Sequence, residues 1–516
     1  MTLTGRSSWL TSPIWGWFVM VVSALLTPFA FAPYRLYWLM PVLVAAMLYT
    51  AATQAKYRLR MVYVWALLAY FVQCYWINTA LHDIAGLPLY ISIPLTALLP
   101  AYLALYPTLA IWLCEKCHFN HFGRLLLVFP LAWTLTEFVR ERALTGFGWG
   151  ALGYSQIAAS PLAGYAPISG IALVTWAVAL ISAALVGLIL CKPLWQRTTN
   201  VLVIVATIGG GYMLSQQHWT QPDGTQAKVA LLQGNIAQGM KWDPEAFQHT
   251  IQTYYNMVAT TEADIVIMPE TAIPVMRQDL PDGVIGQFAT AAQRNKAALA
   301  MGIPQYTPTG RQYLNSVVNL SHFDAEQTEQ SLPSYSKEHL VPFGEFKPVF
   351  TDWLYGLMHM PLSDFSGGGK GQAPLQLANQ KIAFNVCYED SFGDDLVASA
   401  KSSSLLSNVS NMAWYGTSHA MDLQIQQSQA RALELGRYMV RSTNTGLTAV
   451  IDPQGHITSL APRDTEQVLY ATVQGYQGMT PYMQLGSTWP LASLFGVVLL
   501  LLCVYSHRLK HRRSSY

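Results

Sequence analysis

The chain has 516 residues, of which only 11% are charged while 52% are hydrophobic. Ordinary soluble chains carry about 25% charged residues, so this composition excludes a soluble protein of this length. It excludes intrinsic disorder as well, because the chain is too apolar. The net charge of +2 gives no sign of nucleic-acid binding. The 16 Trp and 27 Tyr residues fit a membrane protein, in which aromatic rings gather at the lipid interface.

Long stretches without a charged residue predict membrane-spanning helices, each of which needs about 20 mostly apolar residues. Six such stretches precede residue 223 and one lies at the C-terminal end: 7–34, 36–55, 61–82, 84–114, 143–191, 198–222 and 467–507. A weaker candidate is 125–136. Because 146–167 is rich in Gly, Ser and Pro, the run 143–191 predicts a single helix at about 168–190. We therefore predict an eight-helix transmembrane bundle, with seven helices in 1–220 and the eighth at 484–506.

The distribution of basic residues predicts the orientation, because short basic loops mark the cytoplasmic side. With eight spans, the basic residues that follow the even-numbered spans share one side: Lys56, Arg58, Arg60, Lys116, Arg124, Lys192, Arg197 and the basic tail 507–516. Arg140 and Arg142 fall on the opposite side and count against this scheme. The polar segment 225–475 then faces the periplasm of a bacterium, and the chain lies in the inner membrane.

The segment 225–475 has the polar density of a soluble domain and alternates strand and helix patterns. Strands are predicted at 228–236, 264–270, 298–303, 316–323, 381–387, 404–409, 446–451 and 468–473, and helices at 244–263 and 420–438. Apolar strands that alternate with helices are typical of a layered α/β domain. A segment of roughly 250 residues is also large enough to bury a core of its own.

Cys387 is the only cysteine in this polar segment. The other five lie in or beside the predicted spans: Cys74, Cys114, Cys117, Cys191 and Cys503. Cys387 therefore has no partner for a disulfide within its domain. By position alone, a lone thiol is more often a buried core residue than a reactive one. At a strand-to-helix turn, however, it feels a helix N-terminus, which favours the thiolate.

Three polar residues stand at or near the ends of predicted strands: Glu270, Lys337 and Cys387. In α/β domains, side chains at the carboxyl ends of strands converge on the site. Their chemistry fits a division of labour in which Glu270 is the general base, Cys387 attacks an ester carbonyl and Lys337 stabilises the oxyanion. A strand-end glutamate is also a common helix cap, and a loop lysine is commonly solvated. Spacing alone does not bring the three residues together.

The motifs around these residues resemble the Glu-Lys-Cys signature of the nitrilase superfamily: 269–274, 337–345 and 387–389. Membrane spans on both sides narrow the resemblance to the apolipoprotein N-acyltransferase family. Further matching motifs follow in the same order, at 234–236, 241–244, 410–411, 413–416, 431–437 and 441–446, with 145–149 and 153–156 in the apolar half. The resemblance covers nearly the whole chain.

This resemblance implies a four-layer αββα sandwich joined to eight membrane helices. It also implies an acyl transfer in which the sn-1 chain of a phospholipid, with phosphatidylethanolamine as the expected donor, forms a thioester on Cys387. The acyl group then passes to the α-amine of the N-terminal diacylglyceryl-cysteine of an apolipoprotein. No cofactor, metal or nucleic acid is expected, and the protein is expected to be a monomer.

The resemblance assigns supporting roles near the three residues. Glu345 would support Lys337 or relay protons, and Tyr388 and Glu389 would shape the turn of the nucleophile. His339 is close enough in sequence to be a base, but a structural role is expected for it.

Lipid contacts are expected from loops. Trp242 and Trp414 would lie near the lipid entrance, although simple aromatic packing is the alternative for both. The apolar stretch 350–361, which contains Trp353 and Leu357, is interpreted as an arm that dips into lipid, with a buried core helix as the alternative.

The sequence departs from the resemblance at two places. Many family members have an Asp at the position of Met412. They also have a Pro and a Gln-His pair in the stretch that corresponds to 420–424. The acceptor specificity or the behaviour of a lid is therefore open, and a divergent paralogue that acylates another amine stays an alternative. Two others are a membrane-anchored amidase or nitrilase that hydrolyses its thioester, and a transporter with a binding domain. The clear spans hold almost none of the ionisable residues that a transporter keeps there.

Overall fold

The computed structural model describes residues 12–117, 119–157, 159–237, 244–307, 309–324, 332–347, 364–489 and 491–496. The chain divides into two compact units, each described by itself. The helical unit contains Met1–Tyr75, Pro94–Gln217 and Leu485–Tyr516. The α/β unit contains His218–Gln484 together with Trp76–Ile93, a segment that the sequence had grouped with the membrane helices.

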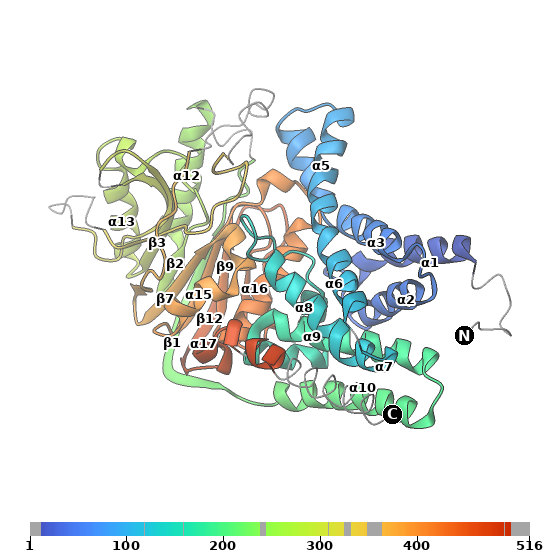
Figure 1. Ribbon diagram of the computed structural model, residues 1–516. Coiled ribbons are helices and arrows are strands. Elements are labelled where there is room, and N and C mark those ends of the chain that lie inside the picture. Colours follow the sequence, from blue (N-terminus) through green and yellow to red (C-terminus); the bar gives the residue numbers. More distant parts are fainter. Residues whose placement is uncertain are drawn as a thin grey trace. The chain divides into compact units, whose positions relative to one another are not determined.

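The helical unit is built almost entirely of apolar helices. They are α1 (Pro13–Leu25), α2 (Leu39–Thr53), α3 (Arg58–Gln73), most of α5 (Leu89–Leu103), α6 (Leu105–Lys116), α7 (His121–Gly123), α8 (Phe129–Arg140), α9 (Ala166–Leu190) and α10 (Leu194–Ser215) (Figure 1). The first begins after Ser12, whose hydroxyl accepts a hydrogen bond from the Trp15 N–H, with Pro13 in the first turn. Short 3-10 or π-helical turns join the rest: Thr27–Ala30, Arg124–Val128, Leu152–Gln156 and Pro161–Tyr165.

Four helical segments of the described chain are long and apolar enough to cross a membrane: Leu89–Lys116, His121–Arg140, Pro161–Leu190 and Leu194–Ser215. The pair Arg58–Gln73 and Trp76–Ile84, bent by 50°, would make a fifth, and α1 and α2 are shorter apolar helices. The chain is thus membrane-embedded. Four or five candidate spans are seen rather than the eight expected, and residues 490 and 497–506 of the expected last helix lie outside the described residues.

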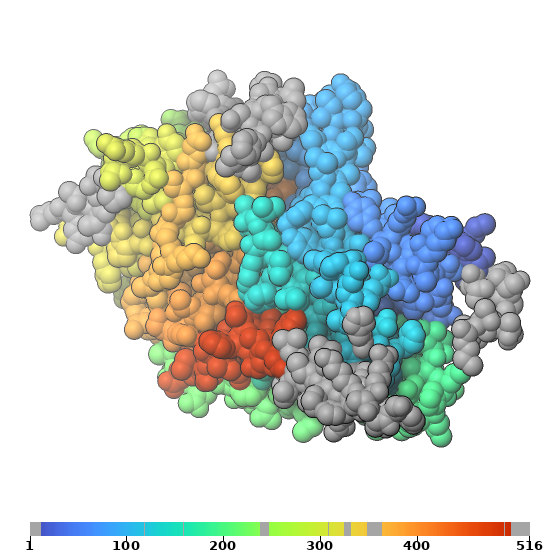
Figure 2. Space-filling model, viewed as in Figure 1, coloured from blue at the N-terminus to red at the C-terminus, as the bar shows by residue number. Residues whose placement is uncertain are grey.

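Large apolar side chains remain exposed on these helices, as expected where lipid replaces water. On α10, Leu194 is 79% exposed and Met213 is 69% exposed. The light-blue region of Figure 2 contains α5, on which Tyr90 is 78% exposed. Helix α10 and the start of α5 therefore leave much of their apolar surface uncovered within the chain, whereas most of α9 is buried.

The α/β unit contains two six-stranded sheets among its described residues. The first has the order β12-β1-β2-β3-β4-β5, and the second has the order β11-β10-β9-β8-β7-β6. The strands are β1 (Thr220–Gln233), β2 (Ile265–Ile267), β3 (Ala298–Tyr306), β4 (Tyr313–Asn319), β5 (Ser334–Ser336), β6 (Leu375–Leu377), β7 (Gln380–Val386), β8 (Leu405–Ser410), β9 (Met439–Thr443), β10 (Ala449–Ile451), β11 (Ile457–Leu460) and β12 (Gln467–Gly478). In each sheet three neighbouring strands are parallel: β1, β2 and β3 in the first, and β7, β8 and β9 in the second.

Two apolar clusters fix the order of the layers. One joins inward side chains of both sheets, such as Leu231 and Phe384, so the sheets face each other. The other joins the first sheet to α12 (Pro244–Thr260) and α13 (Val284–Arg294) through residues such as Tyr254 and Phe288. Helices α15 (Gly393–Ala400) and α16 (Ala420–Leu435) contact the second sheet (Figure 1). The result is the four-layer αββα sandwich that the resemblance implies.

Some predicted elements differ in length or number. The predicted helix 420–438 ends at Leu435, because Gly436 takes a left-handed backbone with φ of 59°, and β9 follows at once. Helix α13 and the strands β5, β6, β9 and β11 were not predicted. The segment Trp76–Ile93 includes α4 (Trp76–Thr79) and a π-helical turn at Ala80–Ile84. Its Trp76 ring packs edge-on against Tyr415, at 4.7 Å between centroids, on the loop after β8.

Candidate active site

Polar side chains gather where strands of the two sheets end. Glu270 lies three residues after β2, Lys337 directly follows β5, and Cys387 directly follows β7. Ser410 is the last residue of β8, and Asn411 follows it. Since β2, β7 and β8 belong to the parallel parts of their sheets, their carboxyl ends form one rim, where α/β domains place their ligands.

Lys337 is the centre of a buried charge cluster, with only 1% of its surface exposed. Its Nζ lies 2.7 Å from Glu345 Oε2 and 3.7 Å from Glu270 Oε1. The structure therefore brings Glu270, Lys337 and Glu345 together. Two carboxylates face one ammonium group, which leaves one negative charge in excess.

Hydrogen bonds hold both carboxylates in place. The Asn315 amide donates to Glu270 Oε1 at 2.8 Å and to Glu345 Oε1 at 3.0 Å. The Asn411 N–H donates to Glu270 Oε2 at 2.8 Å, and the Val341 N–H donates to Glu345 Oε2 at 2.8 Å. Neither asparagine received a role from the sequence. The available signal for Asn315 was its position one residue before a predicted strand, and Asn411 stood in a matching motif.

Cys387 occupies a strained turn. It is the first residue of a 3-10 helix, Cys387–Ser391, and its φ of +52° lies in the left-handed region. For a residue with a Cβ this conformation costs about 1–3 kcal/mol, and it persists only where surrounding contacts enforce it. Thr271, directly after Glu270, has a φ of +46° as well. Backbone strain therefore lies at one of the three predicted residues and directly after a second.

Glu389 supplies the contacts that hold this turn. Its Oε2 accepts hydrogen bonds from the Val386 N–H at 2.6 Å and the Tyr335 hydroxyl at 2.9 Å. Its Oε1 accepts from the N–H groups of Glu338 at 2.6 Å and His339 at 2.9 Å. One buried side chain thus ties the nucleophile turn to the segment that carries Lys337. Burial raises the pKa of Glu389 to about 7.

Tyr388 and His339 pack beside this turn. The His339 ring stacks on Phe392 at 3.5 Å between centroids, and Tyr388 meets both rings edge-on. His339 Nδ1 also lies 3.5 Å from Asp395 Oδ2. These contacts fit the structural role expected for His339 and the shaping role expected for Tyr388.

The charges set the resting state of the site. Although part of Cys387 reaches the surface, protein surrounds its thiol, and this desolvation, with Glu270, raises its pKa to about 12. Lys337 and a hydrogen bond from Ser410 act in the opposite direction. Burial alone would lower the pKa of Lys337, but Glu345 and Glu270 raise it above its ordinary value. Desolvation thus outweighs the helix N-terminus, which favours the thiolate, so the Cys387 thiol needs a base, the role predicted for Glu270.

Of the four residues predicted to contact lipid, the structure describes only one. Trp414 is partly buried in the 3-10 helix Ala413–Tyr415. Trp242, Trp353, Leu357 and the predicted lipid arm 350–361 lie outside the described residues. Met412 and Gln424, from the region where the sequence departs from the resemblance, are both buried.

An αββα sandwich with a buried Lys–Glu cluster and a cysteine at a strained turn is the arrangement expected of an enzyme with a cysteine nucleophile. Residues 228–482 match the profile of the family described as Carbon-nitrogen hydrolase, and residues 23–184 match the Apolipoprotein N-acyltransferase N-terminal domain. Among solved structures, the chain is similar to a nitrilase-superfamily amidase from Nesterenkonia AN1. That likeness has 18% identity, covers 51% of this chain and 95% of that one, and has a TM-score of 0.36.

Relatives match over nearly the full length. The chain is 51% identical over 499 residues to an apolipoprotein N-acyltransferase of Neisseria meningitidis serogroup B, which covers 95% of this chain and 97% of the relative. It is 49% identical over 496 residues to an apolipoprotein N-acyltransferase of Chromobacterium violaceum, covering 95% and 94%. The chain therefore belongs to the apolipoprotein N-acyltransferase family and is a membrane-embedded acyltransferase with a carbon-nitrogen hydrolase domain.

Proposed function

We propose that the enzyme moves the sn-1 acyl chain of a phospholipid, through a thioester on Cys387, to the α-amine of the N-terminal diacylglyceryl-cysteine of an apolipoprotein. The observation that carries this proposal is the single buried cluster in which Glu270 and Lys337 meet and to which Cys387 is electrostatically coupled. The names of the relatives support the apolipoprotein as acceptor. Phosphatidylethanolamine is the proposed donor.

In the first half-reaction, Glu270 takes the proton from the Cys387 thiol as the sulfur attacks the ester carbonyl carbon. The carbonyl oxygen becomes an anion, which the Lys337 ammonium group stabilises. The C–O bond to glycerol then breaks, and Glu270 returns the proton to the departing glycerol oxygen. The products are a lysophospholipid and an acyl thioester on Cys387.

In the second half-reaction, the neutral α-amine attacks the thioester carbonyl and Glu270 takes a proton from its nitrogen. The C–S bond breaks, an amide forms, and the proton returns to the sulfur to restore the thiol. A thioester suits this exchange because it keeps the acyl group reactive toward an amine. The high pKa of the resting thiol makes the proton transfer to Glu270 a necessary part of each cycle.

Three neighbours have supporting roles in this proposal. Glu345 keeps Lys337 charged and in place, as their 2.7 Å ion pair supports. Glu389 and Tyr388 maintain the turn that presents the sulfur. For the lipid substrates we propose contacts with Trp242, Trp414, Trp353 and Leu357.

The membrane arrangement proposed from the sequence is eight spans in 1–220 and 484–506, a cytoplasmic tail at 507–516, and the catalytic segment 225–475 in the periplasm. The apolar stretches and the short basic loops support it. Location in the inner membrane and a monomeric state are part of the same proposal. Both lipid substrates would then meet the enzyme from one leaflet.

The test is intact-protein mass spectrometry of the purified enzyme after incubation with phosphatidylethanolamine and without any acceptor. We expect a mass increase of one fatty-acyl group that hydroxylamine removes and that a diacylated lipopeptide discharges. Cys387→Ser is the matched variant, and it should carry no hydroxylamine-labile group, because an oxygen ester resists that reagent.

Two results would contradict the proposal. Free fatty acid without an acyl-enzyme that the lipopeptide discharges would favour a hydrolase. An acyl group that persists on Cys387→Ser in hydroxylamine-labile form would place the thioester on another of the six cysteines.

A further inference from the structure

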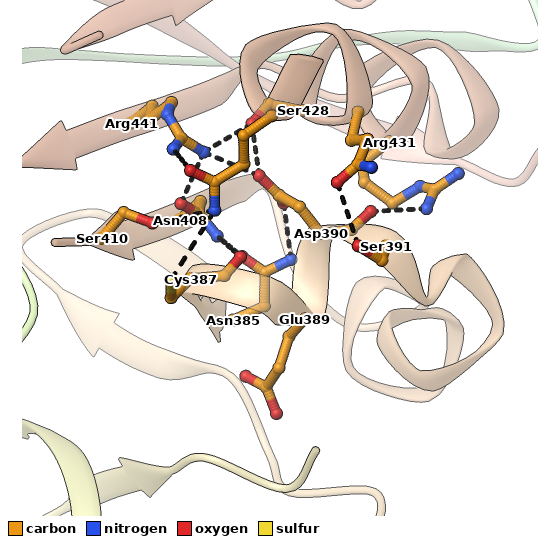
Figure 3. Close-up of polar contacts among 12 residues, drawn as sticks. Asn385, Cys387, Glu389, Asp390, Ser391, Asn408, Ser410, Ser428, Arg431 and Arg441 are labelled. Atoms are coloured by element: carbon orange, nitrogen blue, oxygen red, sulfur yellow. Dashed lines mark hydrogen bonds and ion pairs between the residues drawn. The ribbon is translucent and has the colours of Figure 1, made fainter. Parts of the chain in front are cut away.

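A glutamine on helix α16 points its amide at the nucleophile. Gln424 is fully buried, and its Nε2 lies 3.8 Å from Cys387 Sγ and 3.1 Å from Ser410 Oγ. The first contact is within hydrogen-bonding range for a sulfur acceptor. Figure 3 shows Cys387 and Ser410 within this network of polar contacts. Gln424 belongs to the region 420–424, where the sequence left the acceptor specificity open.

The orientation of the Gln424 amide is set by Arg441 on β9. One guanidinium nitrogen of Arg441, Nη2, donates to Gln424 Oε1. Since a guanidinium group only donates, the amide oxygen must face Arg441, and the NH₂ group must face the sulfur. Arg441 therefore decides which end of the amide Cys387 meets.

Arg441 is itself fixed from three directions and has no exposed surface. Its Nη1 donates to Asp390 Oδ2 at 2.8 Å, to Asn408 Oδ1 at 2.7 Å and to Ser428 Oγ at 2.9 Å. Asn408 in turn donates to the Cys387 carbonyl at 3.3 Å, so the same network holds the backbone of the nucleophile (Figure 3). Although Arg441 Nε has no hydrogen-bond partner among the described residues, the contacts of the two Nη atoms hold the guanidinium group in place.

Ser410 provides a second donor. Its oxygen already accepts from Gln424 Nε2, so its own O–H is free to donate to Cys387, a hydrogen bond that lowers the pKa of the thiol. Two neutral dipoles, an amide N–H and a hydroxyl, thus converge on one sulfur atom.

The surrounding charges explain why neutral donors are needed. Glu270 and Glu345 oppose a negative charge on Cys387, whereas Lys337, which pairs with both carboxylates, favours it. Arg441 and Tyr415 also feel that charge, but Arg441 is paired with Asp390. A thiolate that forms here during the reaction therefore depends on Lys337 and on directed dipoles.

We propose that Gln424 and Ser410 form a two-donor cradle that stabilises the Cys387 sulfur when it is negatively charged, with Arg441 as the positioning residue. The inference rests on the proposed function, in that Cys387 is taken as the nucleophile. Gln424 is a catalytic residue in this scheme because it contacts the reacting atom. It acts when the thiol loses its proton and again when the C–S bond breaks. The departure at 420–424 then concerns the nucleophile and not the acceptor or a lid.

The test measures how fast iodoacetamide alkylates Cys387 in the full-length protein, by peptide mass spectrometry from about pH 7 to about pH 10. Gln424→Leu keeps the size of the side chain and removes the donor. If removing this donor raises the pKa of the Cys387 thiol by about one unit, alkylation should slow roughly threefold at each pH. The slowing is less than tenfold because a more basic thiolate is a better nucleophile, which partly offsets its smaller fraction. Ser410→Ala should slow it in the same direction, and Gln424→Glu, which adds an anion, should slow it further.

Gln429→Leu is the matched control. Gln429 lies on the same helix, is equally buried, and donates to the Gly455 carbonyl at 2.6 Å away from the sulfur. The Gln429→Leu variant should be less stable than wild type, but its Cys387 should be alkylated at the wild-type rate. Equal alkylation rates in wild type, Gln424→Leu and Gln429→Leu would overturn the cradle.

The two proposals can fail separately. If wild type is alkylated with the expected variant effects but never takes an acyl group from phospholipid, the proposed function fails and the cradle stands. If wild type is acylated but Gln424→Leu reacts like wild type in both assays, the cradle fails and the proposed function stands.

Discussion

Each of the two units buries a cluster of charged side chains. The two clusters differ in whether a carboxylate remains available to accept a proton. In the helical unit, Glu137 and Arg140 are 3% and 0% exposed. In the α/β unit, Lys337 is 1% exposed between Glu270 and Glu345. Buried charges are costly in either setting, so each cluster requires an explanation.

The cluster in the helical unit is saturated around its carboxylate. Glu137 Oε1 accepts from Trp133 Nε1 at 2.9 Å, Oε2 accepts from the Thr175 hydroxyl at 2.9 Å, and the Leu152 N–H reaches both oxygens. Arg140 donates to the Trp149 carbonyl at 2.8 Å. These bonds tie the loop 149–152 to helices α8 and α9. Although an ionisable residue in a span is a candidate for a transport path, this one is occupied by structural bonds.

The cluster in the α/β unit, which we propose to be catalytic, differs in composition. It has one more carboxylate than ammonium group, and a cysteine in a left-handed turn is coupled to it. The excess carboxylate can accept a proton, and the strained turn presents an atom that can lose one. Burial of charge alone therefore does not identify a catalytic centre. What distinguishes the proposed catalytic centre is an unbalanced charge beside the proposed nucleophile.

The largest effect is expected from Glu270→Gln, which keeps the shape of the side chain and removes the base. Acyl-enzyme formation from phosphatidylethanolamine should slow by about 10²- to 10⁴-fold, the usual contribution of a general base. Intact-mass kinetics measure this directly. A loss of less than about tenfold would show that another group takes the proton.

Glu389 predicts a pH dependence of the same half-reaction. Its pKa of about 7 means that the four hydrogen bonds at the nucleophile turn lose their charged acceptor below that pH. Acylation should fall as the pH drops through about 7, by up to tenfold per pH unit.

The stability of the protein should move in the other direction. Because the pKa lies above the ordinary value of 4.5, the folded state binds the proton more tightly than the unfolded state. The contribution of Glu389 to stability is therefore largest below about pH 4.5 and is lost as the pH rises toward about 7. Glu389→Gln should remove this component from both the acylation profile and the unfolding profile. If acylation by Glu389→Gln still falls at low pH as it does in wild type, another group causes that pH dependence.

A smaller loss is expected from Glu345→Gln, because Glu270 still pairs with Lys337. Removing one of two carboxylates weakens the charge and position of the ammonium group. A change of one pK unit, or about 1.4 kcal/mol, corresponds to roughly a tenfold slower acylation. A loss as large as that of Glu270→Gln would instead make Glu345 a direct participant in proton transfer.

The sequence predicted the chemistry better than the geometry. Strand ends indicated Glu270 and Cys387, because apolar strands that end in a polar residue are visible in one dimension. Asn315 and Gln424 could not be given their roles, since their partners Glu270 and Cys387 lie 45 and 37 residues away in the sequence. The size of the pKa rise of the thiol could not be predicted either, because desolvation depends on all the neighbours of Cys387. Glu137 was noted only as part of a weak span, and its bonds to loop 149–152 have no sequence signature.

The smallest effect on catalysis is expected from Glu137→Gln, which tests the other half of the comparison. The amide keeps one acceptor, but it turns an NH₂ group toward an existing donor and removes the negative charge near Arg140. The protein should lose about 1–3 kcal/mol of stability, the cost of an unsatisfied buried polar group, seen as earlier thermal unfolding in detergent. Acylation per folded molecule should stay at the wild-type rate.

Thr175→Val, which removes one hydrogen-bond donor to Glu137, should also lower the stability of the protein, by about 1 kcal/mol. If acylation by Glu137→Gln instead fell while its unfolding temperature stayed unchanged, the two buried clusters would share a function. A full set of hydrogen bonds around a buried carboxylate would then not distinguish a structural charge from a catalytic one.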